Sequence, residues 1–125
     1  MSDEKTKSLE AVTRMIELTQ QGKLEWTTES PVRTRNVENN ISPVFYTNYK
    51  DRLLRLYKVK IEVGRSGYSG FSERTAQEKV VLEFVNENGY ALWMFPEVSA
   101  LQDLLTAVKY QLAGVSDFLD DILSE

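Results

Sequence analysis

The chain contains no cysteine and no histidine in its 125 residues. Without cysteine it can form no disulfide and perform no thiol chemistry, and without either residue the usual structural zinc sites are excluded. The absence of histidine also removes imidazole, the most common acid–base catalyst. The serines and threonines therefore have no histidine to activate them, and no nucleophile-elbow glycine pattern surrounds them. These absences predict a protein that is not an enzyme and that uses neither a metal nor another cofactor.

Long apolar runs are also lacking. No stretch approaches the roughly 20 residues of a membrane-spanning helix, and residues 2–5 do not resemble the basic and apolar start of a signal peptide. We therefore expect a cytoplasmic protein with no membrane partner. Apolar residues make up 42% of the chain and charged residues 27%, which is typical of a globular protein. Because no repeat or linker interrupts it, residues 1–125 are predicted to form a single α+β domain.

Charge is unevenly distributed along the chain, although its net value is −4. Residues 31–65 hold eight basic residues against three acidic ones, whereas residues 97–125 hold one basic residue against six acidic ones. The two segments could pair within the chain, pair two copies, or form independent solvated faces. The net negative charge argues against a nucleic-acid partner, because such proteins usually carry a basic domain.

Hydrophobic periodicity predicts the order of the secondary-structure elements. A helix over residues 3–21 ends at Gly22, and strands are expected over 23–28, 44–49, 52–63, 78–85 and 90–95, the last two joined by a hairpin turn at Asn88-Gly89. Ser99 and Gln102 match a capping box before a helix from Ala100 to residue 113, and a short helix follows Ser116. The fold class is therefore α+β, an antiparallel meander sheet of about five strands with an N-terminal helix and a C-terminal helix plus a short helix packed on it.

More apolar surface is present than the predicted helices can cover. In residues 52–63 one face is expected to be the core face, and the other is apolar at one end and charged at the other; residues 90–95 are apolar on both faces. The predicted core face holds Leu53, Tyr57, Val59, Ile61 and Val63. We expect a homo-oligomer whose interface includes Leu54, Leu56, Trp93, Phe118 and Ile122. The alternative is a three-layer monomer, in which the N-terminal helix covers one face and the C-terminal helices the other.

Residues 64–77 are predicted to be a long loop in which three glycines alternate with hydroxyls, aromatics and arginines. Glycines let a backbone approach an anion, arginines bind phosphate in bidentate fashion, and an aromatic ring can stack on a base. Arg65, Tyr68 and Arg74 are therefore candidate ligands of an anionic, nucleotide-like small molecule. The spacing matches neither the phosphate loop nor the dinucleotide fingerprint, so a flexible connection between two strands is the alternative.

Residues 22–26, which read Gly-Lys-Leu-Glu-Trp after a helix, and a leucine-rich last helix running through Gly114-Val115 into an acidic tail resemble small bacterial proteins without an assigned role. The resemblance implies no site residues. The leading expectation is a non-enzymatic binding or interaction protein whose partner is a second copy or another protein. The alternative is a sensor or sequestering protein that binds an anionic ligand through residues 64–74.

Overall fold

The computed structural model describes residues 4–28, 43–66 and 72–125, and side chains in these ranges except those of residues 61–66 and 72–76. The α+β class is confirmed. Helix α1 (Glu4–Gln20) precedes strands β1 (Phe45–Tyr49), β2 (Arg52–Ser66), β3 (Ser72–Val85) and β4 (Ala91–Met94), and helices α2 (Ala100–Leu112) and α3 (Val115–Leu123) follow. Within the described ranges the strands form one four-stranded antiparallel sheet in the order β1-β2-β3-β4. The prediction of about five strands was therefore one too many.

The missing strand is the one expected over residues 23–28. In the structure only Thr27 pairs with the sheet, through an isolated bridge to Tyr46 with N···O distances of 2.8 and 2.9 Å. The amides of Lys23 and Leu24 instead donate to the carbonyl oxygen of Leu18, at 2.9 and 3.1 Å, and close the end of α1. Backbone groups that satisfy a helix end cannot also extend a strand ladder.

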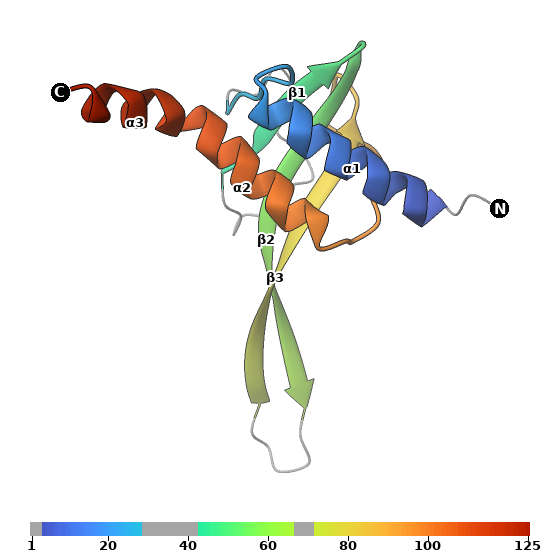
Figure 1. Cartoon of the computed structure of the whole chain (residues 1–125). Coiled ribbons are helices and arrows are strands. Elements are labelled where there is room, and N and C mark those ends of the chain that lie inside the picture. The colour runs from blue at the N-terminus through green and yellow to red at the C-terminus, as the bar shows by residue number, and fades with distance from the viewer. Residues whose placement is uncertain (1–3, 29–42, 67–71) are drawn as a thin grey trace.

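Strands β2 and β3 are much longer than predicted. Their register runs from Leu53 opposite Val85 to Ser66 opposite Ser72, and the outer half of this hairpin extends beyond the helices as an arm (Figure 1). The predicted loop was wrong for residues 64–66 and 72–77, which continue the ladder, while residues 67–71 lie outside the described part of the chain. Cross-strand backbone hydrogen bonds form at any residue type, so composition is a weak guide to where a strand ends.

Helices α1 and α2 lie side by side over one face of the sheet (Figure 1). The main core lies between these helices and the sheet, and it includes Val12, Phe45, Leu54, Leu56, Leu82, Leu101, Leu104, Leu105 and Val108. Among the side chains that the structure describes, the sheet face predicted as the core holds a smaller cluster, formed by Tyr57, Val59 and Val81. Alternation with a period of two separates the two faces of a strand but does not say which one the helices cover. Within the described residues, the three-layer alternative is not formed.

Gly114 separates the two C-terminal helices. It has φ 66°, a left-handed conformation that glycine adopts without a side-chain penalty, and it ends α2 as predicted. The predicted capping box does not form, because Ser99 has helical dihedral angles (φ −60°, ψ −28°) and makes no side-chain cap hydrogen bond. Helix α3 starts at Val115, one residue before the predicted Ser116 cap, and Gly114 is its N-cap residue.

Candidate interaction site

Helix α3 has an apolar side that the described residues of the chain leave exposed. None of its nine residues is buried, and it extends from the end of α2 away from the sheet (Figure 1). Leu119, Phe118, Ile122 and Leu123 are 42%, 62%, 54% and 81% exposed. These large side chains follow the spacing of one helix side, which is typical of a helix that packs against an apolar surface. The described part of the chain does not supply that surface.

The other side of α3 is acidic. Helical spacing places Asp117 and Asp121 along one edge of the apolar side and Asp120 along the other. The helix contains no basic residue. Helix α3 therefore presents an apolar side between two rows of carboxylates, an arrangement suited to a groove with an apolar floor and basic edges.

A groove of this kind opens between α1 and the sheet. Its volume is about 260 Å³, and its described lining is apolar apart from Arg14, Arg52 and the Tyr49 hydroxyl. Arg14 Nη1 pairs with Glu17 Oε2 at 2.6 Å. We call this groove the α1–sheet groove, and its lining residues are Ala11, Arg14, Met15, Leu18, Leu24, Tyr49, Arg52, Leu54, Phe84 and Phe95. Cavities that hold drug-sized molecules usually measure about 300–1,000 Å³, so this groove is better sized for a few side chains of a peptide or helix.

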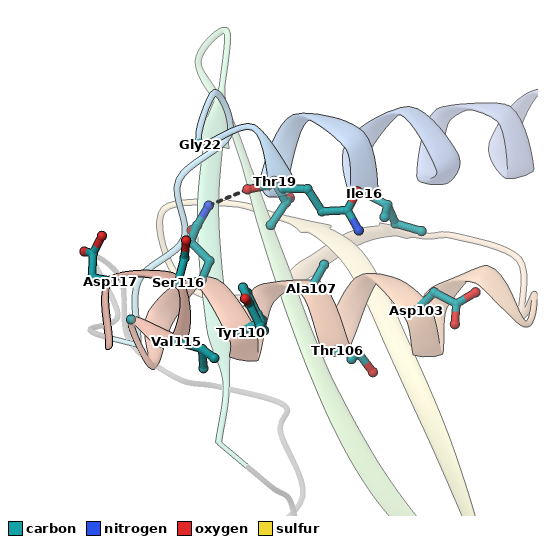
Figure 2. Close-up of a pocket in the computed structure, with 13 residues that line it drawn as sticks. Ile16, Thr19, Gly22, Asp103, Thr106, Ala107, Tyr110, Val115, Ser116 and Asp117 are labelled. Carbon is teal, nitrogen blue, oxygen red and sulfur yellow. Dashed lines mark hydrogen bonds between the residues drawn. The ribbon is translucent and has the colours of Figure 1, made fainter. Parts of the chain in front are cut away.

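A second and larger groove lies between α1 and α2. We call it the α1–α2 groove; it measures about 800 Å³ and includes Ile16, Gln20, Asp103, Thr106, Tyr110 and Asp117 in its lining (Figure 2). Its lining residues include two aspartates and no basic residue. Asp103 and Asp117 lie at opposite ends of the view in Figure 2, so they do not form a joint cation site. Among the described residues, no group of three or more acidic side chains is placed to bind a metal ion.

The edge strand β4 is also exposed. All four residues are exposed, including Trp93 (38%), Met94 (47%) and Leu92 (65%). The ring of Trp93 packs edge-on against that of Phe95 at 4.9 Å, and Phe84 lies 5.4 Å from Phe95. The predicted hairpin before this strand is confirmed, but the described residues do not cover both faces of the strand as expected.

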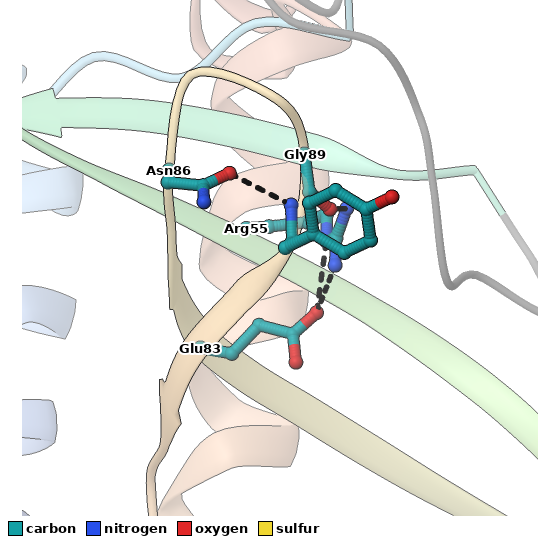
Figure 3. A network of polar contacts seen from close by, with 5 residues as sticks. Arg55, Glu83, Asn86 and Gly89 are labelled. Carbon is teal, nitrogen blue, oxygen red and sulfur yellow. Dashed lines mark hydrogen bonds and ion pairs between the residues drawn. The ribbon is translucent and has the colours of Figure 1, made fainter.

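The sheet face opposite the helices contains a buried ion pair (Figure 3). Arg55 Nε and Nη2 donate to Glu83 Oε1 at 2.8 and 2.6 Å, and Arg55 Nη1 donates to the carbonyl oxygen of Gly89 at 3.0 Å. The guanidinium also lies 5.7 Å from the ring centre of Tyr57. Because the two charged side chains are 0% and 2% exposed, they are inaccessible to a substrate and join β2 and β3 to the β3–β4 turn.

The charge distribution along the sequence did not reveal this pair, because Arg55 falls within the basic segment of residues 31–65. The alternation of apolar residues in the two strands did contain a sign of a buried pair. Arg55 lies between the apolar residues Leu53 and Tyr57 on one face of β2, and Glu83 lies between Val81 and Val85 on β3. When each of two strands carries one charged residue among the apolar residues of one face, and the two charges are opposite, a buried ion pair is indicated. Charged side chains are seldom buried without a partner.

The sequence-predicted interface residues fall into two groups. Leu54 and Leu56 are core residues beneath the helices, 4% and 0% exposed, so they are not available to a partner. They were assigned to an interface because the helices were expected over the other strand face. Trp93, Phe118 and Ile122 are exposed, on β4 and α3.

The predicted ligand residues do not occupy one described loop. Arg65 is opposite Glu73 in the ladder and Arg74 is opposite Gly64, so both belong to the β2–β3 arm. Tyr68 lies outside the described residues. The described geometry therefore does not test the predicted anion-binding site.

Comparisons with models of known protein families, with curated proteins and with solved structures found no match. Among the helices of the described segments, none has the length and apolarity needed to cross a membrane. The chain is an α+β protein, and its described residues form two helices on one face of a four-stranded antiparallel sheet and a third helix projecting from it.

Proposed function

We propose that this protein is a non-enzymatic interaction protein that self-associates through helix α3. The observation that supports the proposal is the exposure of every large apolar side chain of α3, from 42% at Leu119 to 81% at Leu123. Burying such a side chain is worth about 1.5–3 kcal/mol. A surface that covers the helix therefore has a substantial free energy to gain.

The length of α3 strengthens this argument. Isolated helices shorter than about 12–15 residues are marginal in water, and most helices in proteins are stabilised by packing of an apolar side. Helix α3 has nine residues and buries none of them. Contact with another copy would supply the missing packing, and symmetric homo-oligomers are the most common assemblies of soluble chains.

Light scattering tests the proposal. The wild-type chain is expected to have twice the 14.4 kDa mass of one copy. The double variant Phe118→Asp, Ile122→Asp is expected to be monomeric with unchanged circular dichroism, because both side chains are exposed within one copy. The matched control is Leu9→Asp, which changes a 42% exposed leucine on α1 and leaves the dimer intact. A monomeric wild type at millimolar concentration, or a dimer that survives the double change, would contradict the proposal.

The alternative function, sequestering an anionic small molecule at Arg65, Tyr68 and Arg74, stays a prediction. It requires that a nucleotide raises the melting temperature, since a ligand that binds the folded state stabilises it by mass action. The stabilisation should vanish in the variant Arg65→Ala, Arg74→Ala. A screen in which no nucleotide shifts the melting temperature would reject this function.

A further inference from the structure

We infer that α3 of one copy docks in the α1–sheet groove of a second copy, and that the contact is reciprocal. This inference rests on the proposed function and names the surface that receives the helix. The acceptor is the groove whose lining includes Arg52 and the apolar residues Leu54, Phe84 and Phe95.

The volume and the apolar lining of the α1–sheet groove suit the large apolar side chains of α3. The groove holds about 260 Å³ and presents almost only apolar side chains. Anchors of protein interfaces are typically aromatic or large side chains that fill such pockets at the centre of the contact. Phe118 and Ile122 are four residues apart on the same side of α3, so both can enter one groove.

Charge selects between the two grooves. Helix α3 carries Asp117, Asp120 and Asp121 and no basic residue. The described lining of the α1–α2 groove holds Asp103 and that copy's own Asp117 and no basic residue, so an acidic helix of a second copy would be repelled there. The described lining of the α1–sheet groove instead holds Arg14 and Arg52 and no acidic residue. Arg14 Nη1 already pairs with Glu17 Oε2 at 2.6 Å, so Arg52 supplies the basic charge for an acidic helix. Complementary charges at the edge of an interface orient the partners and suppress wrong pairings.

The groove of the same copy does not receive the helix. No α3 residue lines the α1–sheet groove, and α3 extends beyond the end of α2, away from the middle of α1 (Figure 1). Each copy therefore offers one helix and one groove that the described residues leave unfilled. A two-fold axis fills both grooves at once and closes the assembly as a dimer, because such an interface uses the same pair of surfaces twice.

Chemical crosslinking tests the location, and the absence of cysteine makes the chain suited to it. One population carries Ala11→Cys, at an exposed position lining the α1–sheet groove, and the other carries Leu119→Cys on α3. Mixed with a short bismaleimide, the two should give a covalent heterodimer. The control replaces Ala11→Cys by Thr106→Cys, which is exposed and lines the α1–α2 groove.

A charge exchange tests the same contact without a crosslinker. Arg52→Glu should raise the dimer dissociation constant roughly three- to tenfold, because it reverses a charge at an exposed contact. Adding Asp121→Arg to the same chain should restore most of the affinity. Lys23→Glu, an exposed position that lines neither groove, is the control and should leave the constant unchanged.

The outcomes separate this inference from the proposed function. The inference would be supported by a covalent heterodimer between Ala11→Cys and Leu119→Cys, together with recovery of affinity when Asp121→Arg is added to Arg52→Glu. The inference would be overturned, and the proposed function would remain supported, if the dimer depends on Phe118 but crosslinks through position 106. The same holds if Arg52→Glu leaves the dimer dissociation constant unchanged. A monomeric wild type would overturn both the inference and the proposed function. A dimer that is insensitive to changes in α3 but is broken by Leu92→Asp would place the interface on the β4 edge, and it would also overturn both.

Discussion

Arg55 and Glu83 are cross-strand partners on β2 and β3, and Glu83 Oε1 lies 2.6 Å from Arg55 Nη2 with both side chains almost fully buried. The carbonyl oxygen of Gly89 accepts a further hydrogen bond from the guanidinium. Within the described residues, every buried side-chain nitrogen and oxygen atom has a hydrogen-bond partner. The pair therefore joins the sheet to the β3–β4 turn.

Removing one partner of this pair should be strongly destabilising. Glu83→Gln keeps the shape of the side chain but removes the carboxylate charge that pairs with Arg55, and loss of one partner of a buried pair costs about 3–5 kcal/mol. Urea unfolding measures the change. The double variant Arg55→Met, Glu83→Leu should recover most of the loss, since an apolar replacement of a whole buried pair is often neutral or stabilising. A single variant as stable as the wild type would contradict the prediction.

Gln111 should contribute to stability through three hydrogen bonds. Its Oε1 accepts from the amide of Trp26 at 3.0 Å, and its Nε2 donates to the carbonyl oxygens of Thr19 and Leu24 at 2.9 Å each. Gln111→Leu leaves these part-buried backbone groups without this partner and should cost about 1–3 kcal/mol in unfolding free energy. Gln102→Leu, at an exposed position of the same helix, is the control and should change stability by less than about 0.5 kcal/mol.

The Lys58–Glu78 pair should be visible in a pH titration. Lys58 Nζ lies 2.6 Å from Glu78 Oε2, and this hydrogen bond, with the charge of Lys58, holds the pKa of Glu78 below its usual value. Lys58→Met should raise that pKa, as measured by NMR of the carboxyl group. Lys79→Met is the control, because Lys79 does not contribute to the shift. An unchanged Glu78 pKa in Lys58→Met would contradict the prediction.

The sign of the pH effect on stability follows from the direction of this shift. A carboxyl with a lowered pKa in the folded state binds its proton more readily in the unfolded state. The pair therefore contributes above the unfolded pKa of about 4.3, and the contribution is lost as pH falls through the lowered folded value. The stability difference between the wild type and Lys58→Met should accordingly disappear in acid.

Truncation after Gly114 should leave the fold of one copy intact, because α3 buries none of its residues. We expect the circular dichroism of the remaining elements to persist. The melting temperature of the wild type should rise with protein concentration, as expected of a dimer, and that dependence should be absent after truncation. A truncated chain that is unfolded at low concentration would show that α3 supports the single copy.

Elements with a strong local pattern were predictable. The apolar spacing of α1, α2 and α3 and the Asn-Gly turn before β4 each lie within a few consecutive residues, and all four elements are present. The predicted strand over residues 23–28 failed for a local and a non-local reason. The amides of Lys23 and Leu24 close the end of α1 through the carbonyl oxygen of Leu18. The amide of Trp26 donates to Gln111, which lies 85 residues away in the sequence, and no local pattern reports such a contact.

The candidate site was predictable only in part. The apolar spacing of Phe118 and Ile122 identified a helix side that needs a partner, and both residues are exposed. The α1–sheet groove was not predictable, because it brings together residues of α1, β1, β2 and β3. The assignment of Leu54 and Leu56 to an interface failed because alternation cannot show which strand face two distant helices cover.

The sequence by itself determined the α+β class, the identity of the helices and the acidic, apolar character of α3, since each depends on residues near one another in the chain. The tertiary structure decided which sheet face became the core, how far the β2–β3 arm extends, and that Arg55 meets Glu83. It also decided that α3 projects away from the sheet and that the described residues leave a groove between α1 and the sheet, with Arg52 in its lining. These features depend on contacts between segments that are far apart in the sequence. The free energy of such contacts depends on the whole fold, so a short stretch of sequence does not reveal them.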